Sequence, residues 1–294
     1  MFKGSIPALV TPLTPDSTLD IESWRALVEW QIVSGSSALV VAGTTGESPN
    51  LDEAEFTELL SAAVETADGR VPVIAGTGSA STRSTVARTR LAASLGADAA
   101  LVVTPYYNRP PQRGLIAHYL AVADTVALPL IPYNVPGRTG VDLAPESMIE
   151  LARHPGIVAI KEAVADMERV RLLVGAGIRV LSGDDPSART AMLNGASGVI
   201  SVAANVVPST MAQLCRLAVE GQIEGSASID ESLASLYRFL ACESNPVPLK
   251  WLLARSGRIS PALRLPLVEL DERWHEAGQA LADQFEALES SAEL

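Results

Sequence analysis

The residue best suited to covalent chemistry is Lys161, which ends the apolar run 157–161 (IVAIK). An ammonium group buried at the end of such a run loses hydration, so its pKa falls and a neutral amine becomes available. A neutral amine attacks carbonyl carbons and forms a Schiff base. The alternative is a lysine whose head group reaches solvent or pairs with Glu162. Lysine is scarce here, because only Lys3, Lys161 and Lys250 occur among 22 basic residues, and this scarcity favours the catalytic interpretation.

Schiff-base chemistry also needs a proton shuttle, because forming and dehydrating the carbinolamine both move protons. Tyr133 ends the apolar run before that of Lys161, and Thr44 and Tyr107 could extend the relay. A buried tyrosine is often only a core aromatic with a satisfied hydroxyl. However, three of the five tyrosines, Tyr106, Tyr107 and Tyr133, follow apolar runs of this kind, which favours the relay.

Two further features suit the binding of carboxylates. The turn 43–46 (Gly-Thr-Thr-Gly) offers closely spaced backbone N–H groups and the hydroxyls of Thr44 and Thr45, which suit an anion. Arg138 can hold a carboxylate through two parallel hydrogen bonds. Each has an ordinary alternative, because glycine turns are common and most arginines lie on the surface.

These residues follow short apolar runs that alternate with helical patterns. The runs barely alternate in polarity, as expected of parallel strands covered on both faces. Eight such units predict a (β/α)8 TIM barrel, which typically takes about 250 residues, rather than an open sheet. In such barrels the active site lies at the C-terminal ends of the strands. We predict strands at 5–11, 38–42, 71–75, 99–104, 128–134, 157–161, 179–182 and 198–201, and helices at 21–34, 51–66, 82–95, 112–126, 145–153, 167–174, 186–193 and 209–220.

No strand pattern returns after residue 221. Segments 223–240, 246–256 and 271–288 have helical patterns instead. We therefore expect the catalytic barrel to occupy residues 1–221 and a helical C-terminal extension to occupy residues 222–294.

Composition excludes several classes of protein. The chain is 48% hydrophobic, which excludes a disordered protein, and no apolar run approaches the roughly 20 residues that span a bilayer. The net charge of −12, with no basic stripe, argues against a nucleic-acid partner. The N-terminus lacks the pattern of a secretion signal, and the two cysteines, Cys215 and Cys242, are too few for a disulfide framework. We expect buried free thiols in a cytoplasmic protein.

Cofactor and metal chemistry are also disfavoured. Barrels often bind phosphate after the seventh and eighth strands, but residues 182–185 (Ser-Gly-Asp-Asp) would repel it. His118, His154 and His275 lack the spacing of metal ligands. Residues 76–78 (Gly-Thr-Gly) only half match a dinucleotide-binding fingerprint. We expect no cofactor and no metal.

Longer motifs resemble the dihydrodipicolinate synthase family. They are GTTGES at 43–48, TPYYNRP at 104–110, YNVPGRTG at 133–140, IKEA at 160–163, SGDD at 182–185, NPVPLK at 245–250 and LRLP at 263–266. The resemblance covers essentially the whole chain. It implies the condensation of pyruvate with L-aspartate 4-semialdehyde, the first committed step towards diaminopimelate and lysine.

The resemblance also implies catalytic roles and an assembly. Lys161 would form the imine with pyruvate, and Tyr133, Thr44 and Tyr107 would form the proton relay. Tyr107 would reach across a dimer interface into the neighbouring site. The implied assembly is a homotetramer made of two tight dimers.

Four more residues take binding roles by the same resemblance. Thr45 would hold the pyruvate carboxylate, and Arg138 would bind the carboxylate of the semialdehyde. Gly183 and the backbone carbonyl of Ile200 would line the pyruvate pocket.

The sequence departs from the family at the feedback site. Lysine-inhibited members tend to carry polar or ionisable side chains at the positions matching Glu53, Phe56, Ala80 and Ser84. Here Phe56, Ala80 and Ser84 cannot supply that ligation, and Tyr106 is not enough to bind the charges of an amino acid. We expect no appreciable inhibition by L-lysine.

Two other functions compete with this one. Another pyruvate-dependent aldolase, such as an N-acetylneuraminate lyase or a 2-keto-3-deoxy-sugar-acid aldolase, would share Lys161, Tyr133 and the turn 43–46. Arg138 argues against it, because a sugar substrate needs groups that match hydroxyls there. A non-catalytic pyruvate-binding barrel is disfavoured by the intact set of Lys161, Tyr133, Thr44 and Tyr107.

Overall fold

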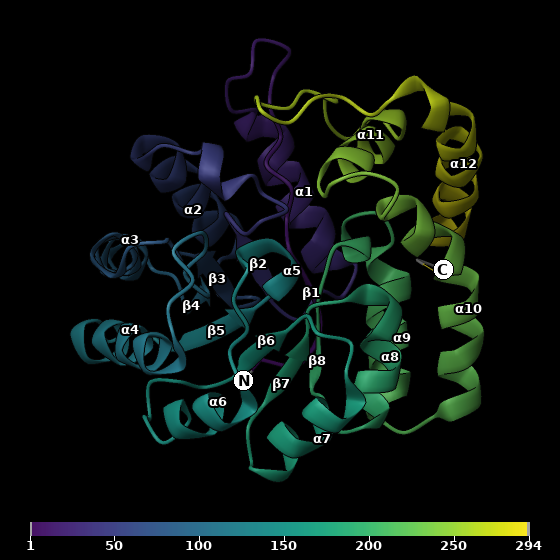
Figure 1. Cartoon of the computed structure of the whole chain (residues 1–294). Coiled ribbons are helices and arrows are strands. Elements are labelled where there is room, and N and C mark those ends of the chain that lie inside the picture. Colours follow the sequence, from purple (N-terminus) through teal and green to yellow (C-terminus); the bar gives the residue numbers. More distant parts are fainter. Residues whose placement is uncertain (1, 293–294) are drawn as a thin grey trace.

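A ring of helices surrounds eight parallel strands in the computed structural model, which describes residues 2–292 (Figure 1). The strands lie in the order β1-β8-β7-β6-β5-β4-β3-β2. They are β1 (Gly4–Pro7), β2 (Leu39–Val41), β3 (Val73–Gly76), β4 (Ala99–Val103), β5 (Leu130–Asn134), β6 (Ile160–Glu162), β7 (Val180–Ser182) and β8 (Gly198–Ser201). This architecture confirms the predicted (β/α)8 barrel.

The barrel closes between its first and second strands through a single bridge. Ala8, just after β1, pairs in parallel with Val40 of β2, and the Leu9 N–H donates to the Val40 carbonyl at 3.0 Å. β1 itself ends at Pro7, so it is shorter than the strand predicted at residues 5–11. The Ala8 N–H still donates to the Ser201 carbonyl of β8 at 2.8 Å, so strand-like contacts continue just beyond the end of β1.

The helices between the strands and directly after β8 are, apart from α5, close to those predicted. They are α1 (Ile21–Val33), α2 (Glu53–Ala67), α3 (Thr82–Ser94), α4 (Gln112–Thr125), α5 (Pro136–Thr139), α6 (Pro145–Leu151), α7 (Met167–Gly175), α8 (Asp185–Leu193) and α9 (Pro208–Val219). The one-turn helix α5 was not predicted, although Pro136 at its first position favours a helical start. Short 3-10 turns occupy Ser48–Asn50, Ala203–Asn205 and Glu272–Trp274.

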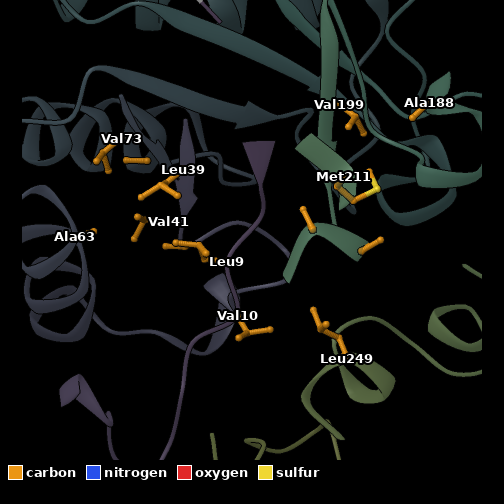
Figure 2. Close-up of a cluster of buried hydrophobic side chains, with 14 of the residues drawn as sticks. Leu9, Val10, Leu39, Val41, Ala63, Val73, Ala188, Val199, Met211 and Leu249 are labelled. Atoms are coloured by element: carbon orange, nitrogen blue, oxygen red, sulfur yellow. The ribbon is translucent and has the colours of Figure 1, made fainter. Parts of the chain in front are cut away.

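Apolar side chains fill two separate regions. The inside of the barrel holds a cluster that includes Ile6, Ile131 and Tyr133. A larger cluster lies between the strands and the outer helices, where Leu39, Val41 and Val73 meet residues of the helices, as Figure 2 shows for part of it. Each fully buried aliphatic side chain of this kind stabilises the fold by roughly 1.5–3 kcal/mol.

The C-terminal residues form three helices on one side of the barrel, α10 (Ile223–Leu240), α11 (Val247–Arg255) and α12 (His275–Ala292) (Figure 1). The predicted boundary at residues 221/222 falls in the connection between α9 and α10. Leu249 of α11 joins the large apolar cluster. The buried Glu289 carboxylate of α12 accepts hydrogen bonds from the backbone N–H groups of Ser209 and Thr210, in the first turn of α9. This contact satisfies N–H groups that the helix itself leaves free.

Both cysteines are free, but they differ in environment. Cys215 is buried in α9, whereas Cys242, just past the end of α10, is half-buried. The expectation that both thiols are buried is therefore wrong for Cys242, because the segment between α10 and α11 lies partly open to solvent.

Within residues 2–292, none of the helices combines the length and the apolar character needed to cross a membrane.

Candidate active site

The barrel directs the side chain of Lys161 into its buried interior. Lys161 lies at the centre of β6, in register with Tyr133 of β5, and only 6% of its surface is exposed. Its Nζ lies 4.3 Å from the centre of the Tyr133 ring. Burial lowers the pKa of Lys161 to about 8, an effect that the Asp185 carboxylate opposes and the Arg138 guanidinium reinforces. About a tenth of this amine is therefore neutral at pH 7, far more than of an ordinary lysine.

Glu162 does not pair with Lys161, which removes the ordinary explanation for a lysine at this position. Successive strand residues point to opposite faces, and Glu162 accepts hydrogen bonds from Arg169 Nε at 2.7 Å and Asn134 Nδ2 at 3.0 Å. Within the part of the chain that the structure describes, no carboxylate lies within ion-pair distance of Lys161. The amine stays available for chemistry inside the barrel.

Tyr133 and Thr44, two of the predicted relay residues, lie together. The Tyr133 side chain is 7% exposed, and burial raises its pKa to about 12. The nearby Arg138 charge and a hydrogen bond with the Thr44 hydroxyl both act against this shift in pKa, while Glu162 adds to it. The phenol therefore keeps its proton at neutral pH and can donate it to a neighbouring group.

The Gly-Thr-Thr-Gly turn that follows β2 is tightly folded. The Gly46 N–H donates to the Gly43 carbonyl, and the Glu47 N–H donates to the Thr44 carbonyl, each at 3.1 Å. Thr45 is buried, and its Oγ1 accepts a hydrogen bond from Asn245 Nδ2 at 3.0 Å. Asn245 was given no role from the sequence, although it begins the NPVPLK motif.

Arg138 lies on α5 at the mouth of the barrel and is exposed. With Thr44 and Tyr106 it lines a cavity of about 340 Å³. Its Nη2 lies 3.5 Å from the Asn245 carbonyl oxygen. The guanidinium is close enough to Lys161 to lower its pKa, and its exposed charge suits an anionic substrate at the entrance.

Gly183 lies against the Lys161 side chain, and Ile200 lies inside the barrel. A Cβ atom at Gly183 would lie 2.9 Å from Lys161 Cε, so only glycine leaves room for this lysine conformation. Ile200 of β8 is 1% exposed and belongs to the apolar cluster inside the barrel.

Tyr107 is the one predicted relay residue that the single chain does not bring to the others. It follows β4, has a φ of 73°, and 94% of its surface is exposed. Its backbone N–H donates to the Thr139 carbonyl at 3.4 Å, which fixes the loop but leaves the ring in solvent.

Comparison with known proteins identifies the family. Residues 1–285 match the model of the dihydrodipicolinate synthetase family. This chain belongs to that family. It is similar to the 4-hydroxy-tetrahydrodipicolinate synthase of Xanthomonas axonopodis pv. citri (strain 306), with 52% identity over 292 residues that cover 98% of this chain and 96% of the relative.

Solved structures of dihydrodipicolinate synthases have the same fold. The chloride-inhibited enzyme of Acinetobacter baumannii, complexed with pyruvate, is 44% identical with a TM-score of 0.95, and the match covers 97% of this chain and 99% of that one. The enzyme of Cyanidioschyzon merolae with lysine bound is 35% identical with a TM-score of 0.92, covering 98% and 99%.

Sequence reasoning missed one further charged residue of the dihydrodipicolinate synthetase site. Arg88 of α3 lines the same cavity as Thr44 and Arg138, and its Cζ lies 4.4 Å above the centre of the Phe56 ring. Its Nη2 is buried without a hydrogen-bond partner among the described residues. Nothing in the sequence marks this arginine, because it occurs in a helix with other exposed arginines.

The shifted pKa of Lys161 gives a testable pH dependence. The rate at which borohydride and pyruvate label Lys161 should rise about tenfold per pH unit below the pKa of about 8 and level off above it, because only the neutral amine reacts. The measurement is labelled peptide against time at each pH, with Lys161→Arg as the unlabelled control. A profile that keeps rising beyond pH 10, as an ordinary lysine near 10.5 would give, contradicts a desolvated amine.

Proposed function

We propose that this chain is a 4-hydroxy-tetrahydrodipicolinate synthase, a lyase of the diaminopimelate route to lysine that condenses pyruvate with L-aspartate 4-semialdehyde. The observation that carries the proposal is the buried amine of Lys161 beside the Tyr133 ring, with the Thr44 hydroxyl near enough to lower the pKa of Tyr133. Membership of the dihydrodipicolinate synthetase family supplies the reaction to which this chemistry belongs.

The first half-reaction uses the barrel interior. Lys161 Nζ adds to the keto carbon of pyruvate, and the carbinolamine loses water to give an imine. Tyr133, through Thr44, carries the protons that these steps release and require. Thr45 and its turn hold the pyruvate carboxylate, while Gly183 and the Ile200 carbonyl bound the pocket.

The second half-reaction takes place towards the mouth. Loss of a methyl proton converts the imine into an enamine, whose carbon attacks the aldehyde carbon of the semialdehyde. Arg138, exposed at the entrance, binds the carboxylate of that substrate. The product leaves when its amino group displaces the Lys161 nitrogen from the imine carbon. The reaction therefore needs no cofactor.

Competing functions share part of this site. A sugar-acid aldolase of the same scaffold would also use Lys161 and Tyr133, but the curated relatives with about half of the residues identical bear the name of the synthase. A non-catalytic barrel would have no need of a buried amine whose pKa is lowered. An assay that offers pyruvate with aspartate semialdehyde, and separately with sugar aldehydes, separates the three.

The assembly we propose is a homotetramer, a dimer of dimers, in which Tyr107 is shared across the tight dimer. The Tyr107 side chain, 94% exposed on a left-handed backbone, supports this arrangement. It extends away from its own chain, so the relay of Tyr133 and Thr44 lacks the Tyr107 hydroxyl unless a neighbouring subunit supplies it. We place the enzyme in the cytoplasm, where free thiols such as those of Cys215 and Cys242 persist.

Substitution of Arg138 tests the binding of the second substrate. Arg138→Ala should lower kcat/KM for aspartate semialdehyde on the order of a hundredfold, because a carboxylate loses its charged partner. Labelling of Lys161 by pyruvate and borohydride should change little. The control is Arg153→Ala, an exposed residue just after α6. Unchanged kinetics with the semialdehyde would instead support a sugar-acid aldolase.

A mixed dimer tests whether Tyr107 is shared. Tyr107→Phe should cut kcat sharply without unfolding the protein, because only an exposed hydroxyl is removed. In a hybrid of Tyr107→Phe and Lys161→Ala subunits, one site receives its lysine from the first chain and its tyrosine from the second. That site is complete, so the hybrid should regain activity that neither parent has. An inactive hybrid would show that each subunit uses its own tyrosine.

L-lysine should not inhibit this enzyme appreciably. Phe56 is fully buried under the Arg88 guanidinium, whose charge repels the two ammonium groups of lysine, and of positions 53, 56, 80 and 84 only Glu53 carries a charge that can pair with them. Initial rates are measured against lysine concentration at low semialdehyde, with a lysine-inhibited relative as the control. Half-maximal inhibition below about 1 mM, which corresponds to roughly 4 kcal/mol of binding, would reveal a lysine site that these contacts do not predict.

A further inference from the structure

Lys250, the second buried lysine of this lysine-poor chain, makes an ion pair within the fold. It lies on α11 with no exposed surface. Its Nζ lies 2.5 Å from Glu47 Oε1 and donates a second hydrogen bond to the Ala262 carbonyl at 2.9 Å. The pair joins the C-terminal extension to the barrel at a buried position.

Glu47 belongs to the same loop as the Gly-Thr-Thr-Gly turn. It is 3% exposed and has a φ of 53°, a left-handed conformation that non-glycine residues rarely adopt. Its backbone N–H closes the turn on the Thr44 carbonyl, while its Oε2 accepts from the Arg264 N–H at 3.2 Å. Two groups of the extension therefore hold the carboxylate of the residue that closes the turn.

The same segment of the extension contacts both sides of the barrel mouth. Asn245, five positions before Lys250, donates to Thr45 Oγ1, and its carbonyl lies 3.5 Å from Arg138 Nη2. Thr45 comes from the loop after β2 and Arg138 from the loop after β5. The segment 245–250 thus bridges the two groups that receive the substrate carboxylates in the proposed function.

We propose that the Lys250–Glu47 pair is a positioning device, through which the C-terminal extension holds Thr44 and Thr45 at the depth that pyruvate requires. The inference rests on the proposed function, because it assigns the pair to the pyruvate half of that reaction. Neither residue touches the substrate; each acts through the turn.

A purely structural role fits these contacts less well. A buried ion pair pays a large desolvation cost and often stabilises a fold no better than apolar residues of similar size, although leaving one partner alone is strongly destabilising. What the pair supplies is a directional link between a helix and a strained turn. A misplacement of about 1 Å at such a turn can cost on the order of a hundredfold in rate.

The test separates positioning from stability with one single and one double variant. Lys250→Met removes the ammonium group but keeps most of the side-chain volume, and it leaves the Glu47 carboxylate buried and unpaired. Lys250→Met with Glu47→Gln removes both charges, so folding and the melting temperature should largely recover. If the pair positions the turn, the folded double variant should still show a pyruvate KM at least about tenfold higher, with the semialdehyde KM nearly unchanged.

Two comparisons make the result decisive. Glu55→Gln breaks a second ion pair between the extension and the barrel, that of Arg264 with Glu55 of α2, while an amide oxygen still serves the N-terminal cap of α2. This control should lower the melting temperature without changing the pyruvate KM. A double variant with wild-type kinetics for both substrates would overturn the positioning role. Wild-type protein that is not labelled by pyruvate and borohydride would instead refute the proposed function itself.

Discussion

Removing one ammonium group from water is the constraint on which the rest of the site depends. A pKa of about 8 for Lys161, against 10.5 for an ordinary lysine, means that burial disfavours the charged form by about 3 kcal/mol. The packing of the barrel interior offsets this cost, because Tyr133 lies against the amine and Gly183 leaves space for the methylene chain of Lys161. Any change that let water reach this amine would restore its charge and remove its nucleophilicity.

The outer face of the same strands keeps the inner face in place. Asn134 and Glu162 are the register partners that follow Tyr133 and Lys161, and they are hydrogen-bonded to each other on the opposite side of the sheet. Arg169 of α7 completes this group by pairing with both Glu162 and Asp142. Because a slip of one residue would exchange the two faces, this polar group fixes the register that brings Lys161 and Tyr133 together.

The C-terminal extension acts on the site from outside the barrel. Its helices add apolar burial, and the Glu289 carboxylate holds α12 against the start of α9. Its contacts with the site are polar. Asn245, Lys250 and Arg264 each donate a hydrogen bond to the loop after β2. A scaffold that places catalytic groups at strand ends still needs a means of fixing the loops between them, and the extension supplies it here.

Local patterns were sufficient to predict much of this molecule. Apolar runs separated by helical periodicity predicted the eight strands, because periodicity depends on neighbouring residues alone, and the strand ends then pointed to Lys161, Tyr133, Thr44 and Arg138 as one group. The short helix α5 and the partial exposure of Cys242 escaped prediction, since both depend on how a connecting segment packs against the rest of the fold. Only the tertiary structure decided that Glu162 turns away from Lys161 towards Arg169, that Arg88 covers Phe56, and that Lys250 meets Glu47 across 203 positions. A contact such as Lys250–Glu47, between residues far apart in sequence, follows from strand register and barrel closure, which no local pattern encodes.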